Sequence, residues 1–216
     1  MRRIIYAILL CWPAWQTLQA QVDNGVQLSH YIFDNFSKGT VRLRSGAVHE
    51  ELLNYNSLTS EMVYSNNGAY LALANPEEVD TVTIQGRSFV PANKKFYEVL
   101  THTPAPLFVE YSCTIKEPGA NIGYGMSSNT AAATQLKSLI QSGGAYGLKL
   151  PDGFEPVPQH SFLLFRDGKF SPANSSRQLT AVFPDKKAWI NQYIKERHPD
   201  FTKREDLVTL VQEVQK

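Results

Sequence analysis

The histidines and carboxylates are the residues of this chain with the widest chemical scope, and their spacing supports few reactions. The five histidines are scattered along the sequence: His30, His49, His102, His160 and His198. No two of them have the spacing of metal ligands. The segment that starts at His49 begins like a zinc-protease helix, but Leu53 stands where the second histidine is required. The sequence therefore predicts no metal-binding residue.

Serine chemistry is the one catalytic class that the residues leave open. The segment around Ser127 lacks the closing glycine of a nucleophile elbow. A serine, a histidine and an acid can nevertheless meet from distant positions, and Ser127 with His160 is the pair we consider. The glycine-rich run from 119 to 125 has no following Lys-Ser/Thr pair, so we expect no nucleotide cofactor. We assign no catalytic or cofactor-binding residue, and we favour a protein that is not an enzyme over the serine hydrolase left open here.

Cys113 lies in a segment that alternates between apolar and polar residues. Leu107, Val109, Tyr111, Cys113 and Ile115 share the apolar face of a predicted strand over residues 107–116. A thiol buried among hydrocarbon neighbours has a raised pKa and little reactivity. We therefore expect a buried, structural Cys113.

The N-terminus has the layout of a secretory signal peptide. Arg2 and Arg3 precede an apolar run, and a small residue, Ala20, stands before Gln21. The run is shorter than the roughly 20 residues of a membrane-spanning helix, and no later stretch is longer. We predict removal of residues 1–20, an exported mature chain and no transmembrane segment within it.

Charge excludes one class of partner. The full chain of 216 residues has a formal charge of +1, and loss of the two leader arginines would make it −1. A near-neutral domain has no electrostatic preference for nucleic acid. We expect no nucleic-acid partner.

Strands are predicted throughout residues 26–116. Short alternating runs end at turn residues every 8–12 positions, which is typical of an antiparallel meander. The signal is strongest at Asn67-Gly68, a favoured hairpin turn that follows an apolar run from Glu61. The predicted fold is mainly β with α: an antiparallel meander that forms a strongly curved sheet or partial barrel, plus a C-terminal helical hairpin.

The C-terminal part has helical spacing. Capping boxes are predicted at Ser175 with Gln178 and at Thr202 with Glu205, each ahead of an apolar stripe. The division we expect is a signal peptide (1–20), a β-rich domain (21–174) with a Gly-rich loop (117–147), and a helical segment (175–216) packed on the sheet.

Several short segments carry a family resemblance. They are Leu53-Asn54-Tyr55-Asn56, Glu61-Met62-Val63-Tyr64, Ile84-Gln85-Gly86-Arg87-Ser88-Phe89-Val90, Phe96-Tyr97-Glu98-Val99-Leu100, and Gly123-Tyr124-Gly125 with Ser128-Asn129-Thr130-Ala131. Together they resemble an uncharacterised family of exported envelope proteins of Bacteroides-type Gram-negative bacteria. The resemblance implies a periplasmic, outer-membrane-associated or secreted location, and it transfers no functional residue.

Three functions fit this sequence. The leading hypothesis is a non-catalytic envelope protein that binds a protein partner or supports an assembly. The alternative is a carrier of a small ligand, a lipid or saccharide, that uses a concave sheet face; a cavity of at least about 300 Å³ with aromatic lining would support it. A serine-type hydrolase is the third.

Overall fold

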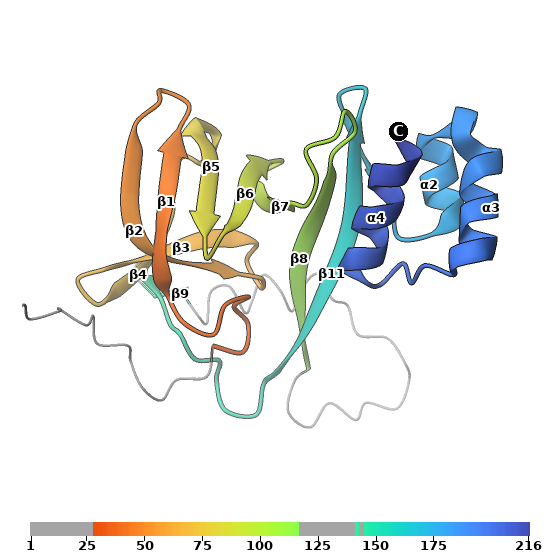
Figure 1. The fold of residues 1–216 in the computed structure, drawn as a ribbon. Coiled ribbons are helices and arrows are strands. Elements are labelled where there is room, and N and C mark those ends of the chain that lie inside the picture. Colours follow the sequence, from red (N-terminus) through yellow and green to blue (C-terminus); the bar gives the residue numbers. More distant parts are fainter. Residues whose placement is uncertain (1–27, 117–140, 143–144) are drawn as a thin grey trace, which may run out of the picture.

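The computed structural model describes residues 28–116, 141–142 and 145–216. The predicted signal peptide and most of the Gly-rich loop, with Ser127, lie outside these residues. Figure 1 shows a mainly β fold in which one antiparallel sheet carries helices at one end. Its strands are β1 (Ser37–Leu43), β2 (Val48–Asn56), β3 (Glu61–Asn66), β4 (Ala69–Ala72), β5 (Val79–Ile84), β6 (Arg87–Ala92), β7 (Lys95–Val99), β8 (Leu107–Lys116), β9 (Gln141–Ser142), β10 (Ala145–Tyr146), β11 (Glu155–Arg166) and β12 (Lys169–Pro172).

The meander predicted from the alternating runs is confirmed. The strand order is β12-β11-β8-β7-β6-β5-β1-β2-β3-β4-β10-β9, and every pair is antiparallel. At the predicted hairpin between β3 and β4, Asn67 and Gly68 have φ of 49° and 84°. Positive φ at both positions is what this tight turn requires.

The predicted strong curvature and partial closure are not found. The sheet is neither closed nor strongly curled, and β12 and β9 are its two edges. A sheet curls into a closed barrel when its apolar face has only the sheet itself to pack against. Here helices cover the face of β8 and β11 instead, as Figure 1 shows.

Three α-helices follow the last strand, where a hairpin of two was predicted. They are α2 (Ser176–Val182), α3 (Lys187–Arg197) and α4 (Arg204–Val214). The 3₁₀ turns η1 (Pro76–Glu78) and η2 (Pro184–Lys186) precede β5 and α3. None of the helices in the described ranges is long and apolar enough to cross a membrane.

The two predicted helix caps differ in outcome. Ser175 caps α2, because its Oγ accepts a hydrogen bond from the backbone N–H of Gln178 at 3.3 Å. Lys203 stands at the cap position of α4 and makes no side-chain cap bond, so the box at Thr202 is wrong. The Thr202 hydroxyl instead donates to Asp200 Oδ1 at 2.6 Å, within the turn that precedes the helix.

The helices pack on the sheet, as predicted. Leu179 of α2 and Ile190 of α3 join four residues of α4 in one buried cluster with alternate residues of β8 and β11. The α4 residues are Leu207, Leu210, Val211 and Val214, and the strand residues are Leu107, Val109, Phe162 and Leu164. A second cluster lies between β1, β2, β3, β5, β6 and β7, with Phe33 of the preceding segment, and centres on Tyr55, Phe89 and Ile84.

The predicted burial of Cys113 in β8 is wrong. Both faces of the strand are buried at Leu107, Phe108 and Val109, but the strand is only half-buried from Glu110 onward. Cys113 is therefore half-buried rather than enclosed, although burial still raises the pKa of its thiol. The helices cover only the first half of this face of the strand, and the apolar row runs on beyond them.

Gly39 allows β1 to lie close to both of its neighbours. It pairs with Glu51 of β2 and Ile84 of β5. A Cβ at this position would lie 2.5 Å from the backbone oxygen of Thr83 and 3.0 Å from Leu53 Cδ1. Neither a backbone oxygen in a ladder nor a buried leucine can move aside easily.

We predict that Gly39→Ala destabilises the protein by about 2 kcal/mol, because the added methyl group overpacks the centre of the sheet. Chemical denaturation of the variant and of the unmodified protein measures this. Lys38→Ala, at an exposed neighbour in the same strand, is the matched control and should change stability little. Equal stability of the two variants would contradict the close packing at Gly39.

Candidate functional site

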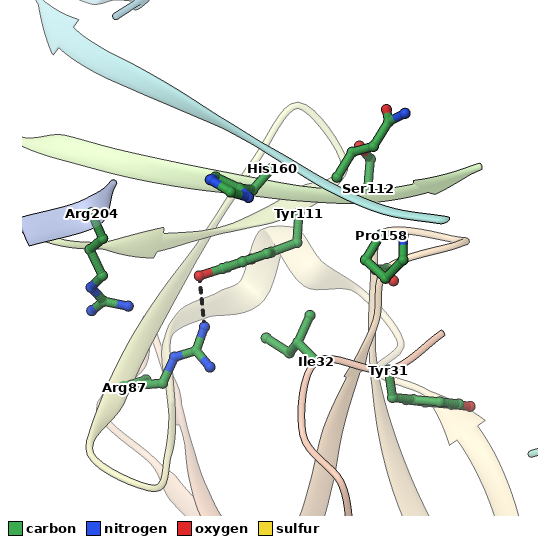
Figure 2. Close-up of a pocket in the computed structure, with 10 residues that line it drawn as sticks. Tyr31, Ile32, Arg87, Tyr111, Ser112, Pro158, His160 and Arg204 are labelled. Carbon is green, nitrogen blue, oxygen red and sulfur yellow. Dashed lines mark hydrogen bonds between the residues drawn. The ribbon is translucent and has the colours of Figure 1, made fainter. Parts of the chain in front are cut away.

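A cavity of about 400 Å³ lies where the sheet meets the start of α4. Figure 2 shows its walls: Tyr31 and Ile32 before β1, Arg87 of β6, Tyr111 of β8, Pro158 and His160 of β11, and Arg204 of α4. Ser57, Ser112 and Gln159 complete the lining. Segments from both ends of the described chain therefore meet at this one cavity.

A buried carboxylate holds one side of the cavity together. Glu98 of β7 has no exposed side-chain surface, and three side chains bind it. Arg87 donates from Nε to Oε1 at 2.9 Å and from Nη2 to Oε2 at 2.8 Å. Tyr111 donates its hydroxyl to Oε2 at 2.7 Å, and Arg204 Nη2 lies 2.8 Å from Oε1. Each oxygen of Glu98 therefore has two partners.

These partners fix the charge state of Glu98. Burial alone would raise the pKa of its carboxyl, but the bonds from Arg87 and Tyr111 and the nearby Arg204 outweigh burial and lower it. For Tyr111, burial and the bond to Glu98 raise the pKa to about 12. The cluster therefore contains one carboxylate, two guanidinium groups and a neutral phenol at neutral pH.

Aromatic rings enclose Arg87. Its guanidinium carbon lies 4.8 Å from the ring centre of Phe33, 5.5 Å from that of Phe89 and 5.3 Å from that of Tyr111. Arg87 Nη2 also donates to the Tyr111 hydroxyl at 2.8 Å, the dashed line in Figure 2. Stacking on ring faces and bidentate pairing with Glu98 give this side chain a single defined position.

His160 and Arg204 connect the cavity to the helices. His160 pairs with Tyr111 across β11 and β8, and its Nε2 lies 3.1 Å from the carbonyl oxygen of Thr202. Because a carbonyl can only accept, the proton must lie on Nε2. Two residues further along the chain, Arg204 reaches Glu98. The loop before α4 is thus held to the sheet by two polar contacts beside the cavity.

The segment before β1 forms the opposite wall and is tied to β2. The buried Asn54 amide accepts from Phe33 N–H at 3.2 Å and donates to the Phe33 carbonyl at 2.8 Å. Ile32 N–H donates to the Tyr55 carbonyl at 3.1 Å. A side-chain amide thus replaces a strand partner and fixes Tyr31 and Ile32 against the cavity.

His30 lies behind this wall and is fully buried. Neither ring nitrogen has a hydrogen-bond partner in the described part of the chain. Burial lowers the pKa of His30 to about 4, because the charged imidazolium would lose its hydration without a compensating bond. The wall therefore depends on a histidine that stays neutral.

The residues singled out from the sequence are mostly elsewhere. Of the pair Ser127 and His160, only His160 lies in the described residues, where it lines the cavity. His49 is exposed on β2. Among the described residues, no group of three His, Cys, Asp or Glu side chains could hold a metal ion.

Sequence reasoning missed the residues that build the site: Arg87, Glu98, Tyr111 and Arg204. One signal was present, because Glu98 interrupts the apolar run Phe96-Tyr97-Glu98-Val99-Leu100 at the middle of a predicted strand. A carboxylate there must be exposed at an edge or paired. Its partners could not be identified, since Arg204 is distant in sequence.

Comparison with models of protein families, with curated proteins and with solved structures finds no match to this chain. The resemblance to exported envelope proteins therefore stays a prediction, and the site is interpreted from its own geometry.

We predict that Glu98→Gln destabilises the protein by about 3 kcal/mol, because it leaves two guanidinium groups beside an uncharged, buried amide. Denaturation of the variant and of the unmodified chain at neutral pH measures this. Asp80→Asn, which breaks the exposed ion pair with Arg42 (2.7 Å), is the control and should cost much less. Equal losses in the two variants would show that the Glu98 cluster adds no stability.

Stability should also depend on pH through His30. The folded pKa of about 4 is below the ordinary 6.5, so the unfolded chain binds the proton first as the pH falls. The neutral state stabilises the fold fully above pH 6.5, and up to about 3 kcal/mol is lost as the pH falls toward 4. His30→Leu should flatten this part of the profile, whereas His49→Gln should not. An unchanged slope in His30→Leu would exclude His30 as the cause.

Proposed function

We propose that this protein is a non-catalytic binding protein that takes a small organic molecule into the cavity between β8, β11 and the start of α4. The observation that carries the proposal is the cavity itself. Its volume of about 400 Å³ is in the range of ligand sites, which hold a few convergent polar groups among apolar ones. Tyr31, Ile32 and Pro158 supply the apolar surface, and Arg204 and His160 supply the polar groups.

Binding fits this geometry better than catalysis does. Glu98 is the one carboxylate of the cluster, and donors from Arg87, Tyr111 and Arg204 already occupy it. Its lowered pKa makes it a weak base. Tyr111 donates to Glu98 and keeps its proton at neutral pH, so it is a poor general acid. The groups of this cluster therefore stabilise the arrangement of the strands and α4 rather than take part in a reaction.

The location we propose is outside the cytoplasm, in the periplasm or associated with the outer membrane. Support comes from the basic start, apolar run and small exit residue of positions 1–20. A ligand carrier in the envelope is the second of the three functions considered from the sequence. The strongly curved sheet that was to enclose the ligand is replaced by a cavity at the junction of sheet and helices.

A protein partner is the second candidate function, and α3 favours it. Trp189 is 37% exposed, and its ring stacks on that of Tyr193 with centres 5.1 Å apart. An exposed indole stacked on a half-buried tyrosine suits an anchor of a protein interface. Trp189→Ala should then abolish capture of a partner while leaving the cavity intact.

The proposal predicts a bound small molecule in the purified protein. The gene is expressed with its leader sequence in a Gram-negative host, and the protein is purified from the cell envelope. Native mass spectrometry should show the mature chain with an added mass that denaturation releases. Pro158→Trp should remove the added mass, because Pro158 is exposed on the cavity wall and an indole there would fill the space. Val48→Trp, at a position that is 58% exposed, is the matched control and should retain it.

Two results would contradict the proposal. The first is a protein that shows no added mass and gains none after incubation with an envelope extract. This result would show that the cavity holds no such ligand. The same added mass in Pro158→Trp would place the ligand elsewhere. The spectrum also tests export, since a chain that begins at Gln21 is expected and retention of Met1 would exclude it.

A further inference from the structure

We infer that the ligand of this cavity carries a carboxylate and that Arg204 is the residue that binds it. The inference rests on the proposed function and adds the chemical class of the ligand. Four observations lead to it: the balance of charges, the engagement of Arg87, the exposure of Arg204 and the apolar opposite wall.

The charges around the cavity leave one positive charge unmatched. Arg87 and Arg204 contribute two, and Glu98 contributes one negative charge that both arginines share. A ligand with a single negative charge would balance the cluster. A cationic ligand would meet two guanidinium groups, and Glu98, the carboxylate that the described residues place beside them, is already paired with both. A phosphate, with nearly two negative charges, would exceed the balance.

Arg87 is already engaged, so it is not the ligand's partner. Its Nε and Nη2 both point to Glu98, and Nη2 also serves Tyr111. The rings of Phe33, Phe89 and Tyr111 surround its guanidinium, and 26% of the side chain is exposed. Arg87 positions Glu98 and Tyr111.

Arg204 has donors to spare and lies open to the cavity. Its side chain is 42% exposed, and its contact with the cluster is an ion pair in which Nη2 lies 2.8 Å from Glu98 Oε1. A guanidinium carries five N–H donors in a planar fork that matches the two oxygens of a carboxylate. Glu98 therefore holds Arg204 in place at one edge, and the remaining donors are available to a ligand.

The rest of the cavity suits an apolar or aromatic body. In Figure 2, Ile32 and Tyr31 lie across the cavity from His160, and Pro158 lies between them. Tyr111 closes the floor with a hydroxyl that is already bonded to Glu98 and Arg87. A molecule with its carboxylate on Arg204 would therefore place its carbon skeleton against Ile32, Tyr31 and Pro158.

The test compares two probes of equal size, 3-phenylpropionate and its neutral amide 3-phenylpropanamide, titrated by calorimetry into the mature protein stripped of bound molecules. The carboxylate should bind at least about 10-fold more tightly than the amide, which is the strength of one charge-assisted pair. Arg204→Gln should remove this difference between the two probes. Arg197→Gln, at an exposed arginine of α3, is the matched control.

Arg204 also anchors α4, so a second variant separates binding from folding. Arg204→Lys keeps the charge beside Glu98 but loses the fork, and it should retain the fold with about 3-fold to 10-fold weaker carboxylate binding. Equal binding of acid and amide would overturn the inference and leave the proposed function standing. Tighter binding of phenyl phosphate than of the carboxylate would overturn it too. Binding of neither probe would also overturn it, and native mass spectrometry would then decide the proposed function separately.

Discussion

The buried carboxylate of Glu98 is the constraint on which this structure depends. Burying a carboxylate away from water costs free energy unless hydrogen-bond donors or cations pair with its oxygens. Hydrogen bonds come from Arg87 of β6 and Tyr111 of β8, and an ion pair comes from Arg204 of α4, whereas Glu98 itself lies on β7. The relative positions of these four elements therefore depend on the partners that this one carboxylate requires. Apolar packing then fills the space around them.

The cavity is a consequence of this arrangement. One apolar cluster joins the helices to β8 and β11, and another lies within the strands from β1 to β7. Tyr111 contacts both clusters. Neither cluster extends across the junction, because the polar groups of Arg87, Glu98 and Arg204 occupy it. The space that remains has charged groups on one side and apolar side chains on the other, which is the pattern that a ligand with two unlike ends requires.

Local patterns predicted local structure well in this chain. Alternation located β8 with its bounds, Asn67-Gly68 located a hairpin, and Ser175 located the start of α2. What failed depended on contacts distant in sequence. The sheet does not curl because helices cover it, and Cys113 is half-buried because they stop short of it. The Thr202 box failed because α4 begins one residue later than predicted, with Lys203 at its cap position. The Glu98 cluster could not be found, since its four members lie on separate elements and none forms a motif.

The sequence separation between Arg204 and its partners has a consequence for how the molecule matures. Residues 87, 98 and 111 are made early and can assemble within a local meander, but the cavity stays unfinished until α4 docks. Contacts of long sequence separation form slowly, so this closing step comes late in folding. A chain cut short before α4 would lack one wall of the pocket. Ligand occupancy would therefore distinguish molecules in which α4 has docked from those in which it has not.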